Sequence, residues 1–160
     1  MSLEELFQKA KENPRLRQEF IDEIDLGEHN KYISKLKYEG NSKNEIMSCY
    51  NFWHGHFGIT KTKSKILIYN NAFTHDKIEN IHDFLGLLKH HEGFHAMERF
   101  EGIFGPNRIS IYDIETQIKE DMKIELRTCQ NEQKNITEKN SQTYKNWVKD
   151  KITAYQKLLN

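Results

Sequence analysis

The sequence predicts an α+β fold in which a small sheet lies between helical segments. Apolar residues recur at helical spacing near both ends of the chain, and a central stretch is rich in β-branched and aromatic residues. With 160 residues, the chain has the length of one domain. We expect an N-terminal helical segment (1–44), a segment of sheet and helices (45–130), and a loop with a C-terminal helix (131–160).

The N-terminal segment begins with an amphipathic stretch over residues 3–24. Leu16 and Phe20 are separated by four residues, which places them on one helix face. Pro14 suits the first position of a helix, where the N–H that proline lacks is not needed. We therefore expect helix here, with a break at Pro14.

The centre of the chain contains two stretches typical of strands, Ile46–Phe57 and Ser64–Asn70. Both combine β-branched and aromatic side chains. The segment between them, Gly58–Lys63, is expected to turn the chain. These stretches predict two or three strands.

Helical spacing returns at Asp76 and is expected to persist to about Phe100 or Ile103. Asp76 and Glu79 have the spacing of a helix N-terminal capping pair. After Gly105–Pro106, which ends this helix, two further helices are expected at 111–130 and 143–159, separated by a polar loop.

Composition argues against several classes of partner. The 24 basic and 24 acidic side chains give a net charge of zero, so no positive field favours nucleic acid or an anionic membrane. No apolar run approaches the length of a bilayer span, and the first residues lack the order of a signal peptide. We expect a cytoplasmic protein without nucleic-acid or membrane partners, whose two cysteines are thiols.

The residues with the clearest chemistry are His91-Glu92-Gly93-Phe94-His95, which match the pattern H-E-x-x-H. Residues four apart lie one above the other on a helix, so both imidazoles can bind one tetrahedral metal ion. Glu92 lies beside them, where it can accept a proton from water. The motif predicts a zinc site with His91 and His95 as ligands and Glu92 as the catalytic residue.

The motif is expected to face the protein interior. Phe84, Leu87 and Leu88 form an apolar stripe, and His91 and His95 continue it at about 100° per residue. An alternative reading is that the two imidazoles are hydrogen-bonded core histidines. In that case the chain would be a helical interaction module with a coincidental motif.

A carboxylate must complete the site, because no histidine follows His95 in the sequence. In the helix expected at 111–130, Glu115 falls within the apolar stripe. A carboxylate among apolar side chains is costly unless it is paired or bound to metal. We therefore expect Glu115 as the third ligand. Glu125 also falls within the stripe, nearly three turns further along, and is the reserve candidate.

His91-Glu92-x-x-His95, 19 intervening residues and then Glu115 resemble the gluzincin metallopeptidases, thermolysin-like enzymes among them. The resemblance covers roughly residues 45–130. It implies a zincin-like fold, one Zn²⁺ per chain, and hydrolysis of peptide bonds in a peptide or protein substrate by an activated water. It also implies an edge strand for an extended substrate, with Ile66–Tyr69 as the candidate.

The chain departs from this family at one position. An Asp often follows the glutamate ligand by four residues and orients a ligand histidine, and Lys119 stands there in this chain. A zincin-fold metal-binding protein without peptidase activity is therefore an alternative. The donor for the developing oxyanion is open among Arg108, Tyr112 and Tyr144. The C-terminal helix at 143–159 could cover the cleft and hold the enzyme latent.

Overall fold

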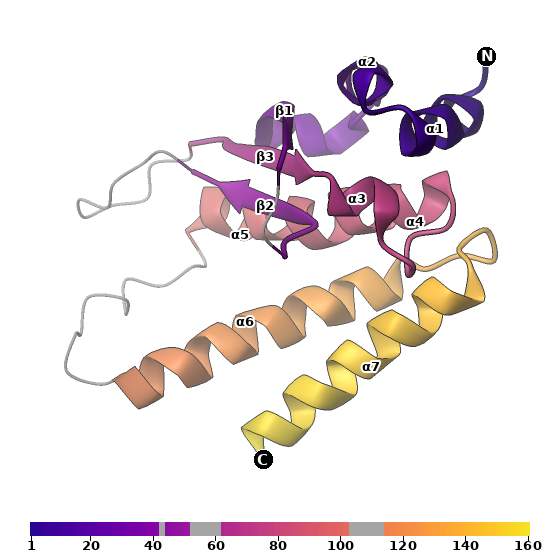
Figure 1. The fold of residues 1–160 in the computed structure, drawn as a ribbon. Coiled ribbons are helices and arrows are strands. Elements are labelled where there is room, and N and C mark those ends of the chain that lie inside the picture. Colours follow the sequence, from indigo (N-terminus) through magenta and orange to yellow (C-terminus); the bar gives the residue numbers. More distant parts are fainter. Residues whose placement is uncertain (42–43, 52–61, 103–113) are drawn as a thin grey trace.

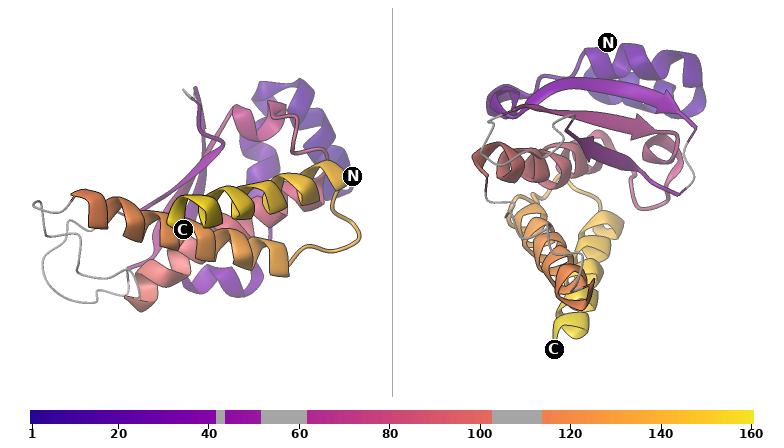
Figure 2. Two further views of the ribbon diagram at one scale, coloured as in Figure 1. Left: turned by 90° about the horizontal axis from the view of Figure 1, so that it is seen from below. Right: turned by 90° about the vertical axis from the view of Figure 1, so that its left-hand side faces the viewer.

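The computed structural model of the chain describes residues 1–41, 44–51, 62–102 and 114–160. Its elements form successive layers, which the right-hand view of Figure 2 shows from one end. The N-terminal helices cover one side of a small sheet, and the helix that carries H-E-x-x-H covers the other. Two long C-terminal helices lie beyond the motif helix (Figure 1). The predicted α+β class is confirmed.

The N-terminal helices are α1 (Leu3–Glu12), the 3₁₀ turn η1 (Pro14–Leu16), α2 (Arg17–Asp22) and the 3₁₀ turn η2 (Gly27–Lys31). Ser2 caps α1 by accepting a hydrogen bond from the Glu5 N–H. The break at Pro14 is confirmed, because α1 ends before it and Asn13 caps the turn that follows. This cap lets the chain change direction and place α1 and α2 over one apolar interior.

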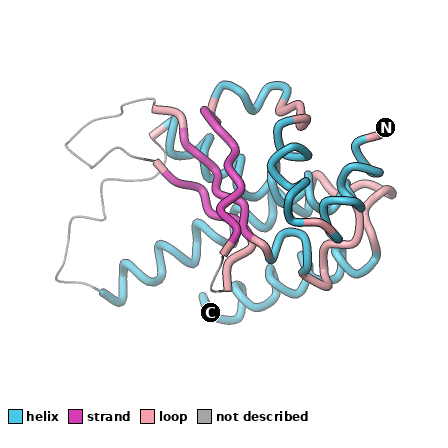
Figure 3. The backbone as a smooth tube through the Cα atoms, turned by 45° about the horizontal axis from the view of Figure 1, so that its top comes forward, coloured by secondary structure: helices cyan, strands magenta, loops and turns pink. Residues whose placement is uncertain are grey.

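The sheet consists of β1 (Ile33–Gly40), β2 (Met47–Tyr50) and β3 (Ser64–Tyr69) in the order β1-β3-β2 (Figure 3). β1 is parallel to β3, and β2 is antiparallel to it. The expectation that Ile66–Tyr69 forms an edge strand is wrong, because β3 lies in the centre. Within the described part of the chain, β2 lies at an edge instead. Residues 52–61, which include most of the expected turn, lie outside the described residues.

β1 lies within residues 1–44, for which the sequence predicts helix, and that prediction is wrong. From Leu36 onward, half-buried residues alternate with exposed ones, which is the period of a half-buried strand. An irregularity in the pairing with β3 between Ile33 and Lys35 shifts this alternation by one residue. The apolar signal is therefore too short to identify the strand from the sequence.

The main core is an aromatic cluster between the N-terminal helices and the motif helix. Phe7, Phe20, Phe73 and Phe84 are at most 1% exposed, and their neighbouring ring centroids lie 5.2–6.1 Å apart. Phe73 comes from the short helix α3 (Asn71–Thr74). This cluster fixes the start of the motif helix.

The motif helix consists of α4 (Ile81–Leu85), the π-helical segment η3 (Gly86–Glu92) and α5 (Gly93–Glu101). Its N-cap is Asn80, which accepts a hydrogen bond from the Asp83 N–H. Asp76 and Glu79 do not form the cap, so that prediction is wrong. Gly102 ends the helix in the left-handed conformation (φ 70°), which glycine adopts without strain. The expected stop at Gly105–Pro106 lies outside the described residues.

The two C-terminal helices, α6 (Ile114–Lys134) and α7 (Gln142–Leu159), lie side by side along most of their length (Figures 1 and 2). Cys129 of α6 packs against Tyr144, Val148 and Ile152 of α7. The helix α6 extends into the polar stretch expected as loop, which therefore begins only after Lys134.

A buried carboxylate joins the start of α7 to the motif helix. Asp83 accepts hydrogen bonds from the Ser141 N–H and hydroxyl at 3.0 and 2.7 Å, and from the Asn140 amide at 3.2 Å. Because Asp83 is fully buried, these contacts replace its hydration. The register of the α6–α7 pair against the motif helix is thereby fixed. Among the described helices, none has the length and hydropathy needed to cross a membrane.

Candidate metal centre

The two motif histidines project from the same face of the motif helix. His91 lies in the last turn of η3 and His95 in the first turn of α5, and their ring centroids are 5.1 Å apart. Their side chains are only 12% and 9% exposed. The expectation that the motif faces the interior is confirmed. A π-helical turn beside such a cluster is often found at functional sites.

The carboxylate that meets the histidines is Glu125 of α6. Its oxygens lie 3.5 Å from Nε2 of His91 and 3.1 Å from Nε2 of His95. The donor atoms of these three residues lie within 4.8 Å of one another, which is close enough to hold one metal ion. Three side chains from two helices therefore converge on one point.

Glu115, the carboxylate expected from the sequence, is not brought to this point. It is exposed in the first turn of α6, and ten residues along a helix separate it from Glu125, about 15 Å. Ile114 and Ile118 beside it are also exposed, by 70% and 48%. Among the described residues, the apolar stripe of α6 is buried only toward the C-terminal end of the helix. The reserve candidate Glu125 takes the place expected for Glu115.

The carboxylate of Glu125 lies between the two imidazoles. Its Oε1 lies 3.1 Å from Nε2 of His95, and its Oε2 lies 3.5 Å from Nε2 of His91, so each oxygen is beside a different ring. Two imidazoles and one carboxylate are also the donor types that zinc accepts, and three such ligands leave one position for water or substrate.

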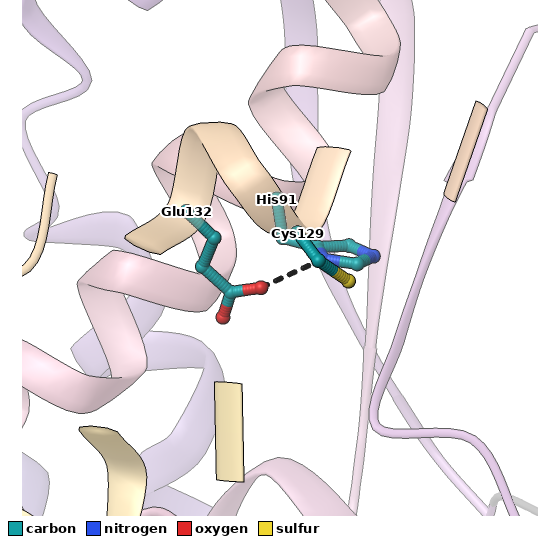
Figure 4. Close-up of side chains that lie close together, drawn as sticks. All are labelled: His91, Cys129 and Glu132. Atoms are coloured by element: carbon teal, nitrogen blue, oxygen red, sulfur yellow. Dashed lines mark hydrogen bonds and ion pairs between the residues drawn. The ribbon is translucent and has the colours of Figure 1, made fainter. Parts of the chain in front are cut away.

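The second nitrogen of His91 is held by Glu132, in the last turn of α6. Nδ1 of His91 lies 2.9 Å from a Glu132 oxygen (Figure 4). An ionised carboxylate only accepts hydrogen bonds, so Nδ1 carries the proton and Nε2 is left to face Glu125. If Nε2 carried neither a proton nor a metal ion, its lone pair would point at a lone pair of the Glu125 oxygen, and the two would repel each other. A cation between them, either a proton or a metal ion, removes this repulsion.

The ionisation of these groups reflects the same arrangement. Burial alone would lower the pKa of His91, but hydrogen bonds with Cys129, Glu125 and Glu132 hold that pKa well above its ordinary value. Burial alone would raise the pKa of Glu125, but hydrogen bonds from His91 and His95 lower it. The negative charge of the Glu125 carboxylate is thus compensated by protons on the imidazoles. Zinc would compete with these protons for the imidazole nitrogens.

Glu92 lines the same cavity, of about 370 Å³, as the three converging side chains. It is 7% exposed. Burial raises the pKa of Glu92, although the nearby imidazoles of His91 and His95 act in the opposite direction. A carboxylate with a raised pKa is a better proton acceptor, which suits a general base in a hydrolytic site.

The edge strand β2 forms another wall of this cavity, through Met47 and Cys49. Arg99 of α5 also lines the cavity and donates a hydrogen bond to the Cys49 carbonyl at 2.7 Å. Arg99 follows His95 by four residues and therefore shares its helix face. This spacing could have identified Arg99 from the sequence. Among the described residues that line the cavity, Arg99 is the cationic one.

The remaining candidates from the sequence do not join the cavity. Arg108 and Tyr112 lie outside the described residues. Tyr144 is buried against Glu132 and is not among the residues that line the cavity. None of the described lining residues comes from α7, so the expectation that the C-terminal helix covers the cleft is not supported.

His91, Cys129 and Glu132 form a second group whose donor atoms lie within 4.8 Å of one another (Figure 4). This group is not a second metal site of comparable quality. The Lys151 ammonium already lies 3.1 Å from the Glu132 oxygen that accepts from His91, and the Tyr144 hydroxyl donates to the other oxygen. A divalent ion would have to share this buried space with a lysine cation.

Comparison of the chain with models of known protein families, with curated proteins and with solved structures finds no match.

Proposed function

We propose that this chain is a zinc-dependent metallopeptidase whose ion is held by His91, His95 and Glu125. The observation that carries the proposal is the convergence of two imidazole Nε2 atoms and one carboxylate at distances of 3.1 and 3.5 Å. A site of this composition with an open position would supply a Lewis acid and lower the pKa of a bound water. Hydrolysis is the reaction class that such a site serves best.

Glu92 and Arg99 would supply the other groups that the reaction needs. Glu92 lies in the cavity beside the ligands and would accept the proton of the attacking water, then donate it to the departing amine. Arg99, on the same wall, would face the negative charge that develops on the scissile carbonyl oxygen. Glu92 and His95 are each only 7% exposed, which limits the access of bulk water to these two groups.

An extended peptide is the substrate class that suits the surroundings of the site. Among the strands that the structure describes, β2 pairs with β3 and lies at one edge of the sheet, where the Cys49 carbonyl accepts a hydrogen bond from Arg99. Such an edge can bind an extended chain through main-chain hydrogen bonds. Met47 and Cys49 place this strand at the cavity that holds Glu92. A peptide bond laid along β2 would therefore pass close to the proposed ion.

Zinc content separates the two candidate carboxylates on α6. We expect about one zinc per chain in the wild type and in Glu115→Gln, and little zinc in Glu125→Gln, measured by elemental analysis after dialysis against chelator-free buffer. Glu115→Gln is the matched control, because it makes the same chemical change on the same helix. Equal zinc in both variants would remove Glu125 from the ligand set, and absence of zinc from all three proteins would refute the proposed centre.

Glu92→Gln separates catalysis from metal binding. The loss of a general base reduces kcat/KM by about 10²–10⁴-fold, while zinc content should stay at the wild-type level. The measurement is cleavage of a mixture of internally quenched peptides by zinc-loaded protein. Retention of full activity in Glu92→Gln would contradict the proposed role.

A metal-binding protein without peptidase activity is the second candidate. In the metallopeptidases that the motif resembles, an Asp four residues after the glutamate ligand often orients a ligand histidine. Here Cys129 stands four residues after Glu125, and the carboxylate that contacts His91 is Glu132, seven residues after Glu125. This departure from the peptidase spacing favours the second candidate. Zinc binding without cleavage of any peptide in the mixture would support this candidate.

A further inference from the structure

We propose that the C-terminal helix α7 is part of the metal site, because Tyr144 and Lys151 fix Glu132 and Glu132 fixes His91. These are positioning residues, since none of them contacts the proposed ion. The inference rests on the proposed zinc centre and identifies which other residues determine its affinity. It assigns α7 a supporting role, in contrast to the cover over the cleft that its amphipathic sequence suggests.

Glu132 is the centre of this network. It is 1% exposed, and its two oxygens accept hydrogen bonds from three side chains. One oxygen accepts from His91 Nδ1 at 2.9 Å and from Lys151 Nζ at 3.1 Å, and the other accepts from the Tyr144 hydroxyl. Three donors thus occupy both oxygens, out of about four acceptor directions that a carboxylate offers, and they hold the carboxylate in one orientation.

Both supporting residues on α7 are themselves held in place. The Lys151 ammonium lies 3.9 Å from the centre of the Trp147 ring, a cation–π contact. Trp147 also lies against the His75 ring, with centroids 5.2 Å apart. Lys151 and Trp147 are four residues apart on α7, so one helix face presents both. The contact with Trp147 therefore holds the Lys151 ammonium in place independently of its ion pair with Glu132.

The motif helix is shaped to receive Tyr144. A Cβ on Gly86 would lie 2.8 Å from the Tyr144 hydroxyl oxygen, closer than a real side chain tolerates. Glycine in the first turn of η3 therefore lets the phenol pass the helix backbone and reach Glu132. Tyr144 is fully buried and has little room to withdraw. This close approach means that the shapes of the motif helix and α7 are complementary at Gly86 and Tyr144.

The consequence for metal binding follows from the imidazole geometry. With Nδ1 bonded to Glu132, Nε2 is the nitrogen directed at the cavity, and it is the atom that a metal ion would bind in place of a proton. If Glu132 loses its supports, His91 can rotate or exchange its proton between nitrogens, and part of the binding energy is spent on ordering it. Loss of such a partner typically weakens metal binding by about 10–100-fold.

The test compares zinc dissociation constants of the wild type, Glu132→Gln, Tyr144→Phe and Lys151→Met, measured by competition with a chromophoric chelator. Glu138→Gln is the matched control, because it makes the same change at an exposed position of the α6–α7 loop. We expect Glu132→Gln to weaken zinc binding by about 10–100-fold. Tyr144→Phe and Lys151→Met should have smaller effects in the same direction, and Glu138→Gln should have none.

Two further measurements separate positioning from folding. Thermal unfolding of each metal-free variant shows whether it remains folded, and Tyr144→Phe provides the test if Glu132→Gln does not. The visible spectrum of the Co²⁺-loaded protein reports the ligand geometry, and we expect its bands to shift in Tyr144→Phe while its metal-free melting curve stays cooperative. An effect on stability alone would leave the spectrum unchanged and would overturn the proposal.

The failure of this inference is distinguishable from the failure of the zinc centre. Wild-type zinc affinity in folded Glu132→Gln and Tyr144→Phe would refute the positioning role and leave the centre intact. Absence of zinc binding in the wild type would refute both. Binding of two zinc ions per chain, one of them lost in Cys129→Ser, would show that Glu132 is itself a ligand and would overturn the positioning role.

Discussion

The aromatic core and the interior of the α6–α7 pair are both buried, but their chemistry differs. The first is built from Phe7, Phe20, Phe73 and Phe84, with rings packed against one another. The second surrounds a buried carboxylate, Glu132, with hydrogen-bond donors. Apolar burial stabilises a fold without further conditions, whereas a buried charge costs free energy unless all its partners are present.

This difference indicates what each region contributes. The aromatic core holds the N-terminal helices and the start of the motif helix together. The polar interior contributes less stability for the volume it occupies, but it fixes the direction of one imidazole. A charged residue kept in such a place is better explained by the orientation of His91 than by stability. Four predictions test this difference between the two regions.

The largest expected effect is that of Phe84→Ala in the aromatic core. Phe84 is fully buried and contacts three other rings of the cluster. We expect a loss of about 3–5 kcal/mol in the free energy of unfolding, because the cavity left behind cannot be filled completely. Urea unfolding followed by circular dichroism measures it. A loss below 1 kcal/mol would mean that this cluster is not the main source of stability.

The second effect concerns Glu132 and depends on pH. Its folded-state pKa is about 2, below the ordinary value of 4.5. The ionised carboxylate therefore adds stability above about pH 4.5, and this contribution disappears as the pH falls through about 2. Its size is at most about 3 kcal/mol. The difference in unfolding free energy between metal-free wild type and Glu132→Gln should shrink from pH 6 to pH 3. A constant difference would contradict the assignment.

The third effect is that of Gly86→Ala, which tests the contact between the two regions. In an isolated helix this change stabilises by about 1 kcal/mol. Here the added methyl group meets the Tyr144 hydroxyl, so we expect a net destabilisation of about 1–3 kcal/mol. The same change combined with Tyr144→Phe should cost less, because the clashing oxygen is absent. Equal costs in both backgrounds would argue against this contact.

The smallest effect is expected at the exposed start of α6. Ile118→Ser and Glu115→Gln should each change the free energy of unfolding by no more than about 0.5 kcal/mol, because both side chains face solvent. Thermal melting of the two variants beside the wild type measures this. A loss of more than 1 kcal/mol in either variant would show that this end of α6 is packed in solution.

The sequence identified the residues whose relation is local. His91 and His95 share a helix face because they are four residues apart, and Glu92 lies between them on the same turn. The apolar stripe before them correctly indicated that the motif faces inward. The helices at both ends of the chain were predicted for the same reason, since each shows its own periodicity.

Non-local relations were not accessible in this way. An amphipathic stripe shows which face of α6 packs, but not how far along the helix its partner lies. Glu115 and Glu125 both fall within that stripe, and only the docking of α6 against the motif helix selects Glu125. Glu132 fell in a stretch that its polar composition marked as a loop, although its spacing of three residues after Cys129 was a usable signal.

Helical periodicity fixes geometry over a few residues, so the pattern of residues was enough to predict two ligands and one base of the proposed centre. The third carboxylate, the residues that orient His91, and the strand beside the cavity became visible only once the elements were packed together. These features depend on the position along each helix or strand at which it contacts its neighbour. That choice is made by the fit of the whole interface, including the close approach at Gly86 and the buried contacts of Asp83, and no single segment encodes it.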